Sequence, residues 1–127
     1  MGDRVEVSSA SVQSLLPRAS IVISEDSTAG LEAMFFGKVV IYAHFADSQP
    51  VMPFVNYGAA LPGYSPEEIW DSLQRGQQLT TIEQNNILQG QINFLRDYTG
   101  PCDGNAHQRI SAFISSVLSS TLPHRAC

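Results

Sequence analysis

Residue types that could bind an anion follow one another in the stretch EDSTAG, near the beginning of the chain. The hydroxyls of Ser27 and Thr28 can donate hydrogen bonds, and Ala29 and Gly30 leave room for a ligand to approach the backbone. Glu32 follows two residues later, where its carboxylate could accept hydrogen bonds from ribose hydroxyls next to a bound phosphate. A helix that starts here would add unpaired N–H groups and a partial positive charge, which bind phosphate without a lysine. The stretch is therefore a candidate phosphate site.

The elements around this stretch are the ones that such a site needs. Residues Ile21 to Ser24 form a β-branched run without polar alternation, which predicts a strand covered on both faces, and Val39 to Ala43 has the same character. Between them, apolar residues at i, i+3 and i+4 predict a helix from Ser27 to Phe36 that ends at Gly37. The pattern is a βαβ unit, so we expect a parallel sheet whose ligands bind at the carboxyl ends of the strands.

A purely structural interpretation of the same residues stays open. Asp26 or Ser27 could simply be the N-cap, Glu32 a solvated helix residue and Gly30 a packing position. The carboxylates of Glu25 and Asp26 would also repel a phosphate at short range. If the turn is a site, we expect both carboxylates to point away from the phosphate, with Asp26 occupied as the cap.

The remaining sequence predicts mainly helices. Before the βαβ unit we expect a short strand at Arg4 to Val7 and a helix from Ser8 to Leu16; after it we expect a loop from His44 to Tyr57 and a short strand at Gly58 to Leu61. A helix should follow the capping box Ser65-Pro66-Glu67-Glu68. Two more helices are expected, one from Thr80 to Tyr98 interrupted by Gly90 and a last one over 105–121 capped by Asn105.

Two further expectations concern side chains on these helices. Trp70 is expected in the core, and the Gln and Asn residues from Gln77 to Gln91 on a solvated face.

Composition limits the classes of protein. The 127 residues suit one domain, or half of a larger enzyme. Seven basic against twelve acidic residues give a net charge of −5 without a basic patch, which excludes nucleic acid as the expected partner. No signal peptide and no membrane span are recognisable, so we expect a cytoplasmic protein. Cys102 and Cys127 are expected to be free thiols.

Three segments, in order, carry a family resemblance. The stretch LLPRASIVISEDSTAGLEAMFFGKVVIY resembles the nucleotide-sugar site of GT-B type glycosyltransferases. The stretches VNYGAALPGYSPEEIWDSL and FLRDYTGPCDGNAHQRISAFI are similar to later segments of enzymes that build bacterial surface carbohydrates and teichoic-acid-like polymers, including glycerophosphotransferase-like ones. The resemblance extends from about Leu15 to Ile114.

The resemblance implies a fold and an activity. It implies a Rossmann-like three-layer α/β domain over 1–127, with a short parallel sheet flanked by helices, as the second half of a GT-B fold. It implies that Ser27, Thr28, Ala29 and Gly30 hold the diphosphate of a nucleotide-sugar donor and that Glu32 binds its ribose. Such enzymes are generally metal-independent, so neither a metal nor a further cofactor is expected.

The resemblance also implies a missing part. The acceptor site and the usual catalytic base lie on the amino-terminal half of such enzymes, so the catalytic residues are unknown and this chain is expected to be inactive alone. A missing half or a partner subunit would then contact the helix over 105–121, which carries Arg109. The full enzyme could associate peripherally with a membrane.

Several alternatives remain. His44 follows the second strand and could face the donor, or it could be a loop histidine without function. His107 and His124 are expected to be solvated, and Asp103 with Gly104 to form a turn and cap. The chain could also be half of a nucleotide-sugar epimerase, or a non-catalytic Rossmann-like module that binds a partner protein.

Overall fold

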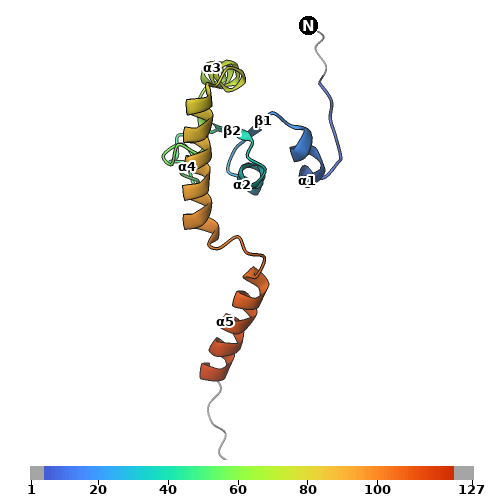
Figure 1. The fold of residues 1–127 in the computed structure, drawn as a ribbon, viewed down its shortest axis with the longest axis vertical. Helices are drawn as coiled ribbons and strands as arrows, with labels where there is room; N and C mark the ends of the chain where they lie inside the picture. Colours follow the sequence, from blue (N-terminus) through green and yellow to red (C-terminus); the bar gives the residue numbers. More distant parts are fainter. Residues whose placement is uncertain (1–4, 122–127) are drawn as a thin grey trace, which may run out of the picture. The chain divides into compact units, whose positions relative to one another are not determined.

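The computed structural model describes residues 5–121, which divide into two compact units (Figure 1). The first unit extends to Leu95 and the second begins at Arg96. The elements in chain order are α1 Val12–Leu15, the 3-10 helix η1 Leu16–Arg18, β1 Ile21–Ser24, α2 Thr28–Phe35, β2 Val39–Ala43, β3 Leu61–Gly63, α3 Pro66–Gln77, α4 Thr81–Thr99 and α5 Ala106–Thr121.

The first unit contains a parallel sheet of three strands in the order β1-β2-β3. Ile21 pairs with Val39, and Ile41 pairs with Leu61. The segment β1-α2-β2 matches the predicted βαβ unit, with the strand bounds that the apolar runs indicated. The mixed α/β class and the parallel sheet are therefore confirmed.

Helices cover both faces of the sheet. On one face, Val40 and Tyr42 of β2 belong to a buried cluster. The cluster also contains Met34 of α2, Phe94 of α4, and Phe54 from the segment between β2 and β3. On the other face, α3 approaches so closely that a Cβ on Gly76 would lie 3.0 Å from the Ile21 side chain and 3.5 Å from that of Val39. Alternate strand residues thus serve opposite layers. This arrangement is compatible with a Rossmann-like fold.

The expectation that β1 is covered on both faces is wrong. Ile23 of β1 is 48% exposed, whereas Val40, Ile41 and Tyr42 of β2 are fully buried. Within the described residues, β1 has a neighbouring strand on one side only. Its apolar run therefore reflects β-propensity as well as burial.

The amino-terminal elements differ from the prediction. Residues 5–7 form no strand, and Arg4 lies outside the described residues. The first helix begins after Ser11, whose hydroxyl oxygen accepts from the Ser14 N–H at 3.3 Å, and it continues as η1 at Pro17.

The third strand is also displaced from its predicted position. It spans Leu61–Gly63, not Gly58 to Leu61. Gly58 has a φ of 66°, which belongs to a turn and not to a strand. Pro62 lies in the middle of β3, and its carbonyl accepts a hydrogen bond from the Ser72 hydroxyl of α3 at 2.6 Å.

The capping box before α3 is confirmed with one change. The Ser65 hydroxyl oxygen accepts from the Glu68 N–H at 3.1 Å, and the Glu68 carboxylate accepts from the Tyr64 N–H at 2.7 Å, one residue earlier than the usual partner.

Trp70 is not in the core, because 60% of its surface is exposed. The face of α3 that meets the sheet carries Ile69, Ser72 and Gly76, at i, i+3 and i+7.

Helix α4 is not interrupted at Gly90. A Cβ on this buried residue would lie 2.5 Å from the Tyr57 carbonyl oxygen and 2.6 Å from the Gly58 backbone. The glycine therefore allows helix and loop backbones to touch. The next residue, Gln91, is 2% exposed and donates its amide N–H groups to the Lys38 and Ala59 carbonyls at 2.8 and 3.3 Å. It does not belong to the expected solvated face.

In the second unit, α5 carries a stripe of exposed apolar side chains, with exposed fractions from 42% to 69%. The stripe consists of Ile110, Phe113, Ile114, Val117 and Leu118. No helix among the described residues is long and apolar enough to span a bilayer.

Candidate functional site

The start of α2 is capped by Ser27. Its hydroxyl oxygen accepts from the Ala29 N–H at 3.2 Å, and its carbonyl oxygen accepts from the Gly30 N–H at 3.1 Å. Thr28 is the first helical residue and is exposed. The predicted diphosphate residues Ser27 to Gly30 thus lie together at a helix start beyond the carboxyl end of β1. A ligand would compete with the cap for the Ala29 amide.

Gly30 has a packing role. It is buried, and a Cβ added to it would lie 3.2 Å from the Phe54 ring and 3.3 Å from the Ser24 hydroxyl oxygen. The close packing of α2 on the core is sufficient to explain why a glycine occupies this position, and the explanation requires no ligand. Its role in holding a diphosphate stays a prediction.

Glu32 points toward the amino-terminal helix. Its Oε2 accepts a hydrogen bond from the Gln13 Nε2 of α1 at 2.9 Å. This hydrogen bond is exposed, although the residue as a whole is half-buried. To bind a ribose, the Glu32 carboxylate must therefore either break its hydrogen bond with Gln13 or accept hydrogen bonds from Gln13 and the ribose together.

Asp26 is not the cap of α2. The Tyr42 hydroxyl of β2 donates a short hydrogen bond to Asp26 Oδ1, and His44 Nδ1 lies 3.7 Å from Asp26 Oδ2. Burial raises the pKa of Tyr42 to about 12, and the Asp26 carboxylate contributes next. The Tyr42 phenol therefore stays protonated and can donate a hydrogen bond to Asp26. The carboxylate is directed toward the end of β2, because the tyrosine there is its donor.

His44 follows β2 directly, outside the strand as expected, and it is held against β3. Its N–H donates to the Gly63 carbonyl at 3.2 Å, and only 6% of its surface is exposed. Its ring lies parallel to that of Tyr42, with the centroids 5.9 Å apart. Its Nε2 donates to the Ser48 carbonyl at 2.8 Å. The sequence indicated the position of His44 but not its partners.

A pocket of about 480 Å³ opens where β2 and β3 end. Its walls come from the segment after β2 and from Tyr64, directly after β3; they include His44, Asp47, Ser48, Gln49, Met52 and Asn56. Pockets of this volume suit small-molecule ligands. Apart from His44, sequence reasoning missed the pocket residues, although their place after a buried parallel strand was a usable signal.

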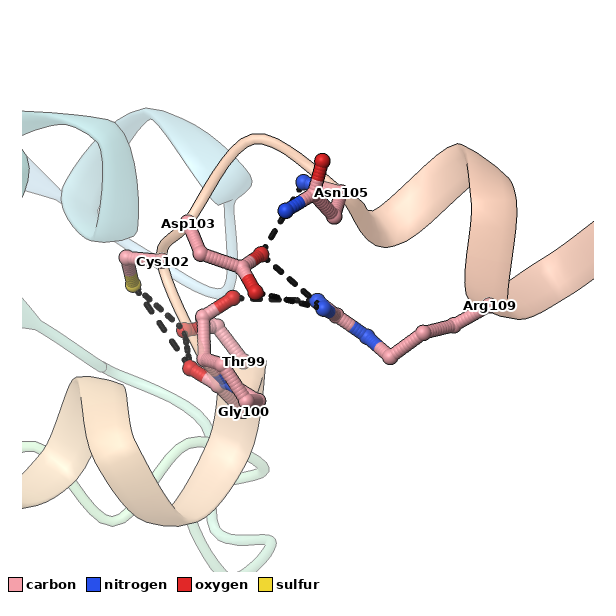
Figure 2. A network of polar contacts seen from close by, with 7 residues as sticks. Thr99, Gly100, Cys102, Asp103, Asn105 and Arg109 are labelled. Atoms are coloured by element: carbon pink, nitrogen blue, oxygen red, sulfur yellow. Dashed lines mark hydrogen bonds and ion pairs between the residues drawn. The ribbon is translucent and has the colours of Figure 1, made fainter.

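The second unit contains a polar network that organises a helix start (Figure 2). The Asp103 carboxylate accepts from the Asn105 N–H and from the Arg109 guanidinium, each at 2.9 Å, and Arg109 also donates to the Pro101 carbonyl at 3.1 Å. The Asn105 N–H, and after it Arg109, hold the pKa of Asp103 below its usual range. The predicted structural role of Asp103 and Gly104 is confirmed, since Gly104 has a φ of 74°.

The other candidates form no further site. His107 and Cys102 are exposed, and Cys102 is a free thiol. His124 and Cys127 lie outside the described residues. No three His, Cys, Asp or Glu residues gather as metal ligands within residues 5–121.

Comparisons with protein-family models, with curated proteins and with solved structures each found no match.

Proposed function

We propose that this chain is the donor-binding half of a glycosyltransferase-like enzyme of bacterial surface carbohydrate biosynthesis, and that it binds a nucleotide-diphosphate sugar. The observation that supports this proposal best is the pocket of about 480 Å³ at the carboxyl ends of β2 and β3. In open α/β sheets this edge is where ligands bind. The start of α2 lies beside it, because Asp26 contacts both Tyr42 and His44.

The two parts of the site suit the two parts of the ligand. The exposed start of α2, with Ser27 and Thr28, offers hydroxyls and helix-end N–H groups to a diphosphate. The pocket, with polar Ser48, Gln49 and Asn56 beside apolar Met52, offers hydrogen bonds and surface to the uncharged part of the ligand. During transfer, the helix end would stabilise the charge that develops on the leaving diphosphate. The acceptor and the catalytic base are assigned to a second half or subunit.

A nucleotide titration tests donor binding. Uridine, cytidine, adenosine and guanosine diphosphates are added separately, at up to millimolar concentration, to the isotope-labelled full chain, and amide signals are followed by NMR. We expect one nucleotide to shift the amides of Ser27 to Gly30 and of His44 in a saturable manner. If the folded protein shows no shift there with any nucleotide, the proposal is wrong.

Glu32→Ala should weaken that binding about tenfold, because one charged acceptor for the ribose is lost. Glu67→Ala is the matched control, since Glu67 lies exposed in the first turn of α3. Equal affinities of the two variants would remove Glu32 from the site.

A second candidate is a non-catalytic module that associates through α5. The side chains of Ile110, Phe113 and Ile114 are 59%, 69% and 51% exposed on one stripe of this helix. The residues between them are Ser111 and Ala112, and α5 contains no acidic residue among 106–121. A second copy of the chain could therefore approach this stripe without repulsion between carboxylates.

Sedimentation of the full chain separates the two candidates. The second candidate requires a dimer at micromolar concentration that Phe113→Ser together with Ile114→Ser converts to monomer, with Ser115→Ala and Ser116→Ala as the matched control pair. A monomer over the whole concentration range, combined with nucleotide binding, contradicts the second candidate.

A further inference from the structure

Two hydrogen-bond acceptors face each other between β2 and the start of α2. His44 Nε2 lies 2.8 Å from the Ser48 carbonyl oxygen, and since a carbonyl only accepts, Nε2 carries the hydrogen. In the neutral ring, Nδ1 is then an unprotonated acceptor. This buried Nδ1 has no hydrogen-bond partner among the described residues, and it lies 3.7 Å from Asp26 Oδ2.

The second oxygen of the Asp26 carboxylate does not remove this unfavourable contact between two acceptors. This oxygen, Oδ1, already accepts from the Tyr42 hydroxyl, which supplies one proton donor to the carboxylate and none to His44. The neutral imidazole thus presents a lone pair toward a carboxylate oxygen. A proton on Nδ1 would convert this repulsion into an attraction between imidazolium and carboxylate.

The titratable groups that face His44 are acidic groups and phenols. Asp26 faces it from the segment before α2, Tyr42 stacks on it from β2, and Asp47 and Tyr64 share the wall of its pocket. Among the described residues that line the pocket, none is Lys or Arg. Within this site, His44 is the side chain that can carry a positive charge.

An anionic ligand at the start of α2 would meet Asp26 at close range. The ligand and Asp26 would repel each other as long as His44 is neutral. A proton on His44 compensates the carboxylate and attracts the ligand. By linkage, a ligand that binds the protonated form more tightly must also increase the protonation of that form.

We propose that His44 takes up a proton at Nδ1 when a nucleoside diphosphate binds at the start of α2. This inference rests on the proposed function. One proton passes from solvent to Nδ1 on binding and returns to solvent when the ligand leaves; no covalent bond within protein or ligand is changed. His44 acts here as a positioning residue that removes the repulsion by Asp26.

Calorimetry of the full chain tests this coupling. The nucleoside diphosphate that binds in the titration is used as the probe, in buffers of different ionisation enthalpy slightly above neutral pH. We expect uptake of up to about one proton per bound ligand, and an affinity that falls by up to about tenfold per pH unit toward alkaline pH. His44→Gln should abolish the uptake and flatten the pH profile, since glutamine keeps an N–H donor for Ser48. His107→Gln, on the exposed face of α5, is the matched control.

The results separate this inference from the proposed function. If no nucleoside diphosphate binds the folded chain at any pH, both are wrong. If one binds without proton uptake and with a flat pH profile in the unchanged protein, the role of His44 is wrong and donor binding stands. If His44→Gln does not fold, the ring nitrogen NMR signals of His44 in the unchanged protein decide. A Nδ1 signal that moves to the protonated position on ligand addition supports the inference, and an unmoved signal overturns it.

Discussion

Gly90→Ala is expected to lower the free energy of unfolding by about 3 kcal/mol, because the added methyl group meets backbone atoms. The added Cβ would lie 2.5 Å from the Tyr57 carbonyl oxygen and 2.6 Å from the Gly58 carbonyl carbon, and backbone atoms cannot rotate away as a side chain can. Helix α4 must then withdraw from the loop, which also disturbs the contact of Phe94 with Phe54 at 4.8 Å between ring centroids. Urea unfolding followed by far-ultraviolet circular dichroism measures the change.

Gly76→Ala is the matched control, because Gly76 is also helical. Its Cβ would meet the Cδ1 atom of Ile21 at 3.0 Å, which is the flexible end of a side chain. Alanine is also the better helix former, by roughly 1 kcal/mol, so the two contributions nearly cancel. Similar unfolding midpoints for the Gly90 and Gly76 variants would contradict the proposed contact between α4 and the loop.

Tyr42→Phe is expected to destabilise the protein by about 1–2 kcal/mol at neutral pH, because the Asp26 carboxylate loses its hydroxyl donor while the ring packing is kept. The larger effect appears in alkaline solution. Burial and the Asp26 carboxylate raise the pKa of Tyr42 to about 12 from its ordinary value of 10.0, so unfolding favours release of its proton. The stabilisation linked to this proton is complete below pH 10 and is lost as the pH rises toward 12.

The linked loss corresponds to about 3 kcal/mol across that interval. The unchanged protein should therefore become steadily less stable between pH 10 and 12, and Tyr42→Phe should lose most of this slope. Tyr64→Phe is the control: burial and Glu68 also raise the pKa of Tyr64, so a smaller part of the slope belongs to it. Urea midpoints at several alkaline pH values give both slopes. An unchanged slope in Tyr42→Phe would show that its phenol is not the protonated donor described here.

The sequence allowed prediction of those features that depend on neighbouring residues. The apolar runs located β1 and β2, the helical spacing located α2, and Ser65 with Glu68 located the start of α3, because caps and periodicity act over a few residues. The prediction that Trp70 is buried was wrong because α3 has the sheet on one side only. The apolar residues of α3 occupy a wide face, so their spacing did not show which of them would meet the sheet.

Contacts between distant residues were not predictable in the same way. Gly90 looks like a helix breaker and Gln91 like a solvated residue until the loop before β3 and the start of β2 are brought against α4. The candidate site shows the same limit. The helix start at Ser27 was visible locally, whereas the partner of Asp26 lies 16 residues later at Tyr42.

The two edges of the sheet differ in how readily they can pair with another strand. Pro62 has no N–H group to offer at the outer edge of β3, and its carbonyl is occupied by the Ser72 hydroxyl. A strand from another molecule would find neither a donor nor a free acceptor at this position, which protects the edge from intermolecular pairing. The other edge of the sheet is β1, which contains no proline and carries the exposed Ile23, so a further strand of a larger assembly is better accommodated there.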